Sequence, residues 1–179
     1  MDSRGVDVVM NKRNVILIGL MGTGKSTVGI ALAERLGYRF VDTDARIEEV
    51  SGMSIKDMFA ELGEAAFRLQ ETACINNVLA DEAQVVATGG GAVLAEVNRQ
   101  TMLEGGLVVA LRASAETIIQ RVREDGNRPL LAGDVEERVR AIMESRKHAY
   151  DFAHLSIQTD GLAVEEITDR IEAGWRSLA

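Results

Sequence analysis

The sequence of 179 residues contains very little cysteine, proline or aromatic side chain. Cys74 is the only cysteine, so an internal disulfide is excluded and a reducing compartment, the cytoplasm, is expected. Pro129 is the only proline, so no proline-rich linker divides the chain. Because 46% of the residues are hydrophobic, the chain can bury one substantial core, and a single domain is predicted.

No apolar run approaches the roughly 20 residues that a membrane-spanning helix needs, and residues 1–13 lack the apolar core of a signal peptide. Positive charge is scarce too: the net charge of -8 disfavours a nucleic-acid surface, because phosphates would be repelled. We therefore expect no membrane and no nucleic-acid partner. Small-molecule ligands and a monomeric chain are expected, and any anionic ligand must meet cations gathered in a cleft.

Short apolar segments alternate with segments of helical periodicity along most of the sequence. The predicted strands are residues 15–18, 38–41, 84–87, 107–111 and 155–159, and the clearest predicted helices are residues 27–36, 44–52, 54–62, 64–79, 117–124, 134–150 and 164–177. Such alternation indicates a parallel sheet covered by helices on both faces, with ligands at the carboxyl ends of the strands. Residues 14–179 are predicted to form this domain, after a flexible extension at residues 1–13.

The most informative motif is Gly19-Leu20-Met21-Gly22-Thr23-Gly24-Lys25-Ser26, which fits the phosphate-binding pattern G-x-x-x-x-G-K-[ST]. It lies between a predicted strand and a predicted helix, a context that a chance glycine-rich turn would lack. The residues predicted to bind the phosphates of ATP are Gly22, Thr23, Gly24, Lys25, Ser26 and Thr27. Lys25 would reach the β- and γ-phosphates, and the Ser26 hydroxyl would ligate Mg²⁺.

Two carboxylates, Asp42 and Asp44, follow the second predicted strand. If this segment is extended, side chains two residues apart project the same way, so one can serve Mg²⁺ through water and the other a substrate hydroxyl. The alternative is an ordinary polar strand end, with an aspartate that caps the next helix. The position beside the phosphate-binding loop favours the first interpretation.

Two arginines on predicted helices, Arg68 and Arg146, are candidates for binding a carboxylate through paired hydrogen bonds, and Glu71 is close enough to orient Arg68. The alternative for each is a solvated helix charge. The run Gly89-Gly90-Gly91 directly follows a predicted buried strand, where backbone without side chains can approach a ligand closely.

The polar loop at about residues 124–133 carries Arg128 and Pro129 between two predicted helices. Glycines at both ends would let it close over bound nucleotide as a lid and bring Arg128 to the phosphates. The alternative is a surface loop without a catalytic role.

Taken together, these motifs make the chain resemble shikimate kinase from residue 15 to residue 159. The residues that carry the resemblance are the loop 19–26, Asp42-Thr43-Asp44 with Ile47-Glu48, Gly63-Glu64, Phe67-Arg68, Glu71, Thr88-Gly89-Gly90-Gly91, Arg128-Pro129-Leu130-Leu131, and Arg146 with Tyr150. Their order and spacing are more specific than any one of them.

The resemblance implies a nucleoside-monophosphate-kinase-like P-loop fold: a three-layer α/β/α sandwich with a five-stranded parallel sheet, a substrate-binding helical region at about residues 43–80 and a lid. It implies transfer of the ATP γ-phosphate to the 3-hydroxyl of shikimate in chorismate and aromatic amino-acid biosynthesis. The implied roles are Mg²⁺ binding by Ser26 and Asp42; catalysis by Lys25, Asp44 and Arg128; shikimate binding by Asp44, Arg68, Gly89, Gly90, Gly91 and Arg146; and ATP contacts by Arg121 and Arg128.

Two features depart from the family pattern. His148 stands where a proline is common, and residues 1–13 have no counterpart. Neither His148 nor His154 is assigned a role, since phosphoryl transfer depends mainly on positioning and electrostatics. Two other functions stay open at this point: a kinase of another small hydroxy acid such as gluconate, and a catalytically idle P-loop protein that acts as a binding module.

Overall fold

The computed structural model describes residues 13–125 and 134–178, so Arg128 and most of the predicted lid lie outside the described residues, as do residues 1–12. The strands are β1 (Asn14–Ile18), β2 (Arg39–Asp42), β3 (Gln84–Ala87), β4 (Gly106–Arg112) and β5 (Leu155–Gln158). The helices are α1 (Lys25–Leu36), α2 (Thr43–Ser51), α3 (Ile55–Leu62), α4 (Glu64–Leu79), α5 (Glu96–Gly105), α6 (Ala115–Glu124), α7 (Val135–Ser145) and α8 (Val164–Ser177), with the short 3-10 helix η1 (Ala92–Leu94).

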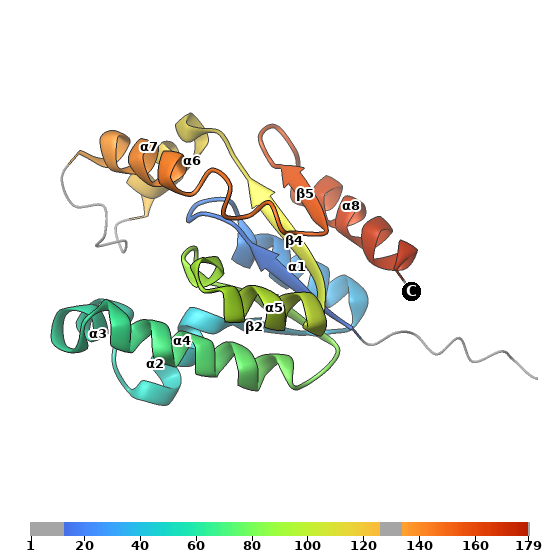
Figure 1. Ribbon diagram of the computed structural model, residues 1–179. Helices are drawn as coiled ribbons and strands as arrows, with labels where there is room; N and C mark the ends of the chain where they lie inside the picture. The colour runs from blue at the N-terminus through green and yellow to red at the C-terminus, as the bar shows by residue number, and fades with distance from the viewer. Residues whose placement is uncertain (1–12, 126–133, 179) are drawn as a thin grey trace, which may run out of the picture.

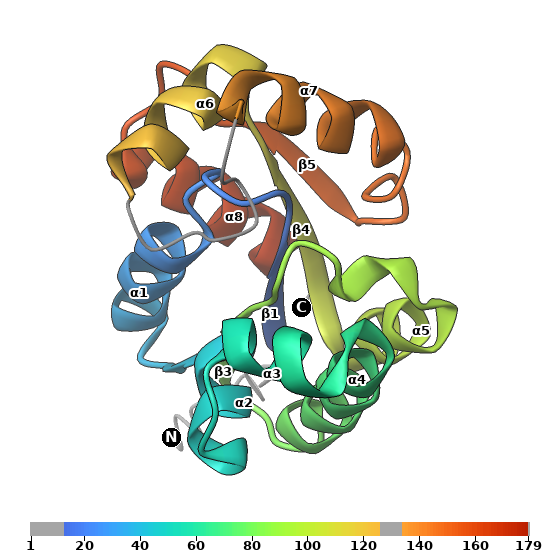
Figure 2. The same ribbon diagram turned by 90° about the vertical axis from the view of Figure 1, so that its left-hand side faces the viewer.

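The five strands pair in parallel in the order β2-β3-β1-β4-β5. Strand β1 is buried on both faces, and its side chains alternate between two cores. Val15 and Leu17 pack with α1 and α8, whereas Ile16 and Ile18 pack with α4 and α5. Figures 1 and 2 show these two helical layers on opposite faces of the sheet. The predicted three-layer sandwich with a five-stranded parallel sheet is therefore confirmed.

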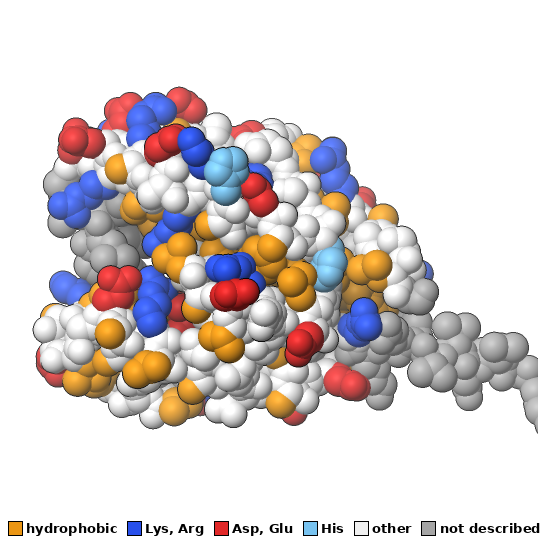
Figure 3. Space-filling model, viewed as in Figure 1, with side chains coloured by type: hydrophobic (Ala, Val, Ile, Leu, Met, Phe, Trp, Pro, Cys, Tyr) orange, Lys and Arg blue, Asp and Glu red, His pale blue; other side chains and the backbone are white. Residues whose placement is uncertain are grey.

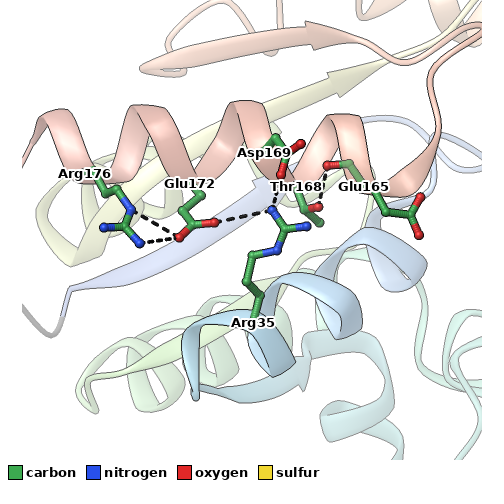
Figure 4. Close-up of polar contacts among 6 residues, drawn as sticks. All are labelled: Arg35, Glu165, Thr168, Asp169, Glu172 and Arg176. Atoms are coloured by element: carbon green, nitrogen blue, oxygen red, sulfur yellow. Dashed lines mark hydrogen bonds and ion pairs between the residues drawn. The ribbon is translucent and has the colours of Figure 1, made fainter.

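The contact between α1 and α8 has buried apolar side chains in its interior and ion pairs at its surface. Leu32 of α1 is fully buried together with Ile171 of α8. At the surface, Arg35 of α1 pairs with Asp169 and with Glu172 of α8 (Figure 4). Because Arg35 and Asp169 are exposed and Glu172 is only partly buried, we expect the buried apolar side chains to supply most of the stability of this contact.

The strand order places the loop after β1 beside the loop after β3. Leu17 of β1 is in register with Ala87 of β3, although 70 residues separate them in sequence. The connection from β1 runs outward to β2, whereas the connection from β3 crosses to β4 on the other side of β1. This is the switch point at which open parallel sheets bind ligands.

Most predicted elements are present with small shifts in their ends. The exception is the helix predicted at residues 134–150, because α7 ends at Ser145 and residues 146–152 form turns. The predicted helix stops at Gly52 and Gly63 are confirmed as C-caps of α2 and α3. Within the described residues, no helix combines the length and the apolar character needed to cross a membrane.

Candidate active site

A cleft of about 750 Å³ opens at the carboxyl ends of β1 and β3. In Figure 3, Lys and Arg side chains face a hollow between the part of the molecule formed by α6 and α7 and the part formed by α3 and α4. All the predicted site residues in the described part of the chain line the cleft: Gly22, Thr23, Gly24, Lys25, Ser26, Thr27, Asp42, Asp44, Arg68, Gly89, Gly90, Gly91, Arg121 and Arg146. The structure thus brings together residues from six separate segments.

The phosphate-binding loop is held by its own polar side chains. Lys25 donates hydrogen bonds from Nζ to the carbonyl oxygens of Gly19, at 2.6 Å, and Leu20, at 2.8 Å. Thr23 is buried and donates from Oγ1 to the Leu20 carbonyl at 2.8 Å. Gly24, with φ of 93°, lies in the left-handed region that favours glycine. These features fold the loop over the first turn of α1, as a phosphate cradle requires.

Arg121 of α6 lies over the phosphate-binding loop. Its Nη1 donates to the carbonyl of Gly22 at 2.7 Å. The guanidinium is therefore next to the segment predicted to bind phosphates, where it can flank a nucleotide bound in the cleft.

The segment with Asp42 and Asp44 differs from the predicted extended conformation. Asp42 ends β2 and caps α2, because its Oδ1 accepts a hydrogen bond from the N–H of Ala45 at 3.1 Å. Asp44 already lies in the first helical turn. The capping alternative is thus correct for Asp42, yet the second Asp42 oxygen still faces the loop: Ser26 Oγ donates to Oδ2 at 3.3 Å. Asp42 can therefore cap α2 with one carboxylate oxygen and still offer the other oxygen to a ligand beside the loop.

Asp44 lies in the cleft among groups of both charges. Its Oδ1 is buried and has no hydrogen-bond partner within the described residues. Burial, followed by the nearby charge of Asp42, raises the pKa of Asp44, while Lys25 and Arg68 oppose the rise. A carboxylate with a spare buried oxygen and a raised pKa is suited to accept a hydrogen bond, and then a proton, from a bound hydroxyl.

Arg68 of α4 is fixed by a buried carboxylate. Its Nη1 donates to Glu71 Oε1 at 2.9 Å, and Glu71 is only 1% exposed. The predicted orienting contact between these two side chains is therefore present. Burial raises the pKa of Glu71, and the hydrogen bond from Arg68 opposes the rise. The Arg68 guanidinium keeps further N–H groups for an anionic ligand.

Arg146 reaches the cleft from the end of α7 rather than from within a helix. It is the C-cap residue of α7, with φ of -109° and ψ of 12°. His148 is exposed in the following turns, where its Nδ1 lies 2.9 Å from Asp151 Oδ2. The absence of proline at residue 148 is thus accommodated in a turn, outside the helix.

The three glycines at residues 89–91 each face a different functional side chain. A Cβ on the first would lie 2.8 Å from Oδ1 of Asp44, and a Cβ on the second 3.5 Å from Nη1 of Arg146. A Cβ on the third would lie 2.7 Å from Nη1 of Arg68. The lack of side chains at the end of β3 therefore makes room for the groups that surround a ligand, and not only for the ligand.

Replacement of Gly91 by alanine is expected to disturb Arg68 first. The new methyl group would displace a guanidinium that Glu71 holds, leaving a buried carboxylate without its partner at a cost of about 1–3 kcal/mol. Thermal unfolding and binding of carboxylate ligands measure the two consequences. Gly90→Ala is the control for stability, because its Cβ meets neighbours at ordinary contact distances. Equal melting temperatures for both variants would contradict this account.

One wall of the cleft was not predicted from the sequence. It is lined by residues in and after the loop that follows β5: Thr159, Leu162, Val164 and Ile167. Asp160 ties this loop to the start of α6, because it accepts hydrogen bonds from the Ser114 N–H at 3.0 Å and from Thr117 Oγ1 at 2.6 Å. These hydrogen bonds, that from Thr117 first, hold the pKa of Asp160 far below its usual range. The position at the carboxyl end of a parallel strand was a signal that could have indicated this wall.

The sheet order, the phosphate-binding loop after β1 and the cleft at the switch point define the class of protein, a P-loop kinase with a nucleoside-monophosphate-kinase-like fold. The sequence model of the family described as shikimate kinase matches residues 21–174. The chain therefore belongs to the shikimate kinase family, whose members are ATP-dependent kinases.

Individual relatives agree with this assignment. The shikimate kinase of Geobacter sulfurreducens is 48% identical over 167 residues, which cover 93% of this chain and 92% of that protein. The shikimate kinase of Thermodesulfovibrio yellowstonii is 41% identical, with 93% and 97% covered. The solved structure of shikimate kinase from Acinetobacter baumannii in complex with shikimate superimposes with a TM-score of 0.88 at 38% identity, covering 94% of this chain and 95% of that one. The family predicted from the sequence motifs is confirmed.

Proposed function

We propose that this chain transfers the γ-phosphoryl group of ATP to the 3-hydroxyl of shikimate, giving shikimate 3-phosphate and ADP in chorismate and aromatic amino-acid biosynthesis. One observation carries the proposal. In a single cleft, two arginines and a carboxylate surround the glycines after β3, directly beside the phosphate-binding loop after β1. Cations for a carboxylate and an acceptor for a hydroxyl proton are the groups that a hydroxy acid requires next to a nucleotide phosphate.

The acceptor acid would lie on the glycine floor at residues 89–91. Arg68 and Arg146 bind its carboxylate, and Asp44 accepts a hydrogen bond from the reacting hydroxyl. The hydroxyl oxygen forms the new bond to the γ-phosphorus as the bond from phosphorus to the oxygen of the ADP leaving group breaks. The hydroxyl proton passes to Asp44, and Lys25 stabilises the charge on the transferred group.

The residues at the loop fit a magnesium ion. Ser26 Oγ and Asp42 Oδ2 lie 3.3 Å apart, and both are hard oxygen donors. Among the described residues, no cluster of three or more His, Cys, Asp or Glu could hold a metal ion. A site with one or two protein ligands, completed by phosphate and water oxygens, is typical of Mg²⁺ in kinases. When bound, the ion neutralises negative charge on the β- and γ-phosphates.

The remaining parts of the proposal concern the nucleotide and the state of the chain. Arg121 flanks the adenine, and Arg128 in the lid at residues 124–133 stabilises the transferred phosphoryl group. The proposed reaction needs no second copy of the chain, because the described residues with an assigned role all line one cleft. A cytoplasmic location is supported by the single cysteine, Cys74, because such a composition suits a reducing compartment.

An assay of ADP release with shikimate, quinate and gluconate tests the proposal. We expect kcat/KM for shikimate to exceed that for gluconate by about 100-fold or more, because an acceptor that leaves buried polar groups unpaired is strongly rejected. The ³¹P–¹H coupling of the product identifies the hydroxyl that carries the phosphate. Preference for gluconate would support the other kinase, and binding of ATP without ADP release for any acceptor would support the idle binding module.

A further inference from the structure

Tyr150 contacts the glycine floor from the side of the hydrophobic core. Its side chain is 3% exposed and packs in the core formed between the sheet and helices α4 and α5. Its hydroxyl donates a hydrogen bond to the carbonyl oxygen of Gly90 at 2.7 Å. Tyr150 is thus joined to the middle residue of the floor, without the exposure expected of a group that contacts ligand directly.

This hydrogen bond sets the orientation of the floor peptide. The peptide bonds of the described chain are trans, so a Gly90 carbonyl that points at Tyr150 directs the Gly91 N–H to the opposite side. A Cβ on Gly90 would lie 3.5 Å from Arg146 Nη1 and 3.5 Å from the Gly19 carbonyl oxygen. The peptide held by Tyr150 is therefore situated between a carboxylate-binding guanidinium and the phosphate-binding loop.

Tyr150 and Arg146 also belong to one short turn segment. The N–H of Ala149 donates to the carbonyl of Arg146 at 3.0 Å, and the N–H of Ala153 donates to the carbonyl of Tyr150 at 3.3 Å. Burial raises the pKa of the Tyr150 phenol, and the charge of Arg146 opposes the rise. The phenol consequently keeps its proton at neutral pH and remains a hydrogen-bond donor.

We propose that Tyr150 is a positioning residue for the acceptor carboxylate: it ties the peptide between Gly90 and Gly91 to the turn that carries Arg146. The proposal rests on the proposed function, because it assumes that the acceptor lies on this floor. Removal of the Tyr150 hydroxyl should therefore weaken binding of the acceptor and leave binding of ATP unchanged. Loss of the hydroxyl loosens the acceptor side of the cleft, while the loop that binds ATP keeps its own hydrogen bonds at Lys25 and Thr23.

The test is Tyr150→Phe, which removes one oxygen and keeps the ring in the core. We expect KM for shikimate to rise about tenfold, the equivalent of ~1.4 kcal/mol, with KM for ATP unchanged within about twofold. Tyr38→Phe is the matched control, because Tyr38 is the only other tyrosine and packs against Trp175 at a ring separation of 6.0 Å. Unchanged constants in Tyr150→Phe, or equal rises for both substrates, would overturn the proposal.

A second measurement applies even if Tyr150→Phe folds poorly. In the Tyr38→Phe variant labelled with ¹³Cζ-tyrosine, the single tyrosine resonance reports Tyr150. Shikimate should shift this resonance and ADP alone should not; an unmoved resonance at saturating shikimate would refute the coupling. Failure of the proposed function is separate, since it would appear as absence of shikimate-dependent ADP release in the unmodified protein.

Discussion

Lys25→Ala is expected to lower kcat on the order of 10³-fold or more, because we propose that the positive charge of Lys25 stabilises the transferred phosphoryl group most in the transition state. The structure adds a second reason. Nζ donates to two carbonyl oxygens of the loop, so the alanine variant loses charge and loop geometry together. Steady-state ADP release at saturating ATP and shikimate measures the effect.

Two further variants separate the two contributions of Lys25. Lys25→Met keeps most of the side-chain stem without the charge, and Lys25→Arg keeps the charge with a different geometry. Both should unfold in one cooperative transition, since the cores around β1 are untouched. Activity of Lys25→Ala within about tenfold of the unmodified protein, a difference of only ~1.4 kcal/mol, would contradict the assignment of the phosphate-binding loop.

Asp44→Asn is expected to retain binding of ATP and Mg²⁺ and to lose about 10²- to 10⁴-fold in kcat, the usual range for a general base. Asparagine keeps the shape of the side chain but cannot take the proton. The raised pKa of Asp44 gives an independent readout. If Asp44 takes the proton, its ionised form is the active one, so kcat/KM, which reports the free protein, should fall as pH decreases through this pKa, at a higher pH than for an ordinary aspartate near 3.9. This acidic limb should be absent in Asp44→Asn.

Asp42→Asn is the matched comparison for Asp44→Asn. Asparagine caps helices as well as aspartate, so α2 should keep its first turn while the charge beside Ser26 is lost. The expected result is a higher Mg²⁺ requirement, with turnover restored by excess Mg²⁺. If excess Mg²⁺ rescued Asp44→Asn and not Asp42→Asn, the two roles would be exchanged.

The phosphate-binding loop could be predicted from the sequence because the residues themselves impose the geometry. Gly22 and Gly24 have positive φ, which glycine adopts readily, and the buried strand and the helix on either side are visible as apolar patterns. The five strands were predictable for the same reason, since short β-branched runs between helices favour a parallel sheet.

The end of α7 and the partners of the glycines could not be predicted in this way. No glycine follows Ser145, so the apolar periodicity continued the predicted helix to Tyr150, whereas the chain turns at Arg146. The glycines at residues 89–91 indicated a close approach, but the groups that approach them come from three other segments. Such a meeting is set by the order of the strands and the packing of helices, which local patterns do not encode.

The glycine floor at residues 89–91 also limits which substitutions could make this protein resistant to an inhibitor. If an inhibitor contacts only the backbone at residues 89–91, the protein has no side chain at these positions whose replacement would weaken inhibitor binding. Any new Cβ at the first or third of these positions would press into Asp44 or Arg68, so the resistant variant would lose the groups proposed to act on the natural acceptor. Because a Cβ on Gly90 meets its neighbours at ordinary contact distances, we expect resistance substitutions within the floor to arise at Gly90 rather than at Gly89 or Gly91.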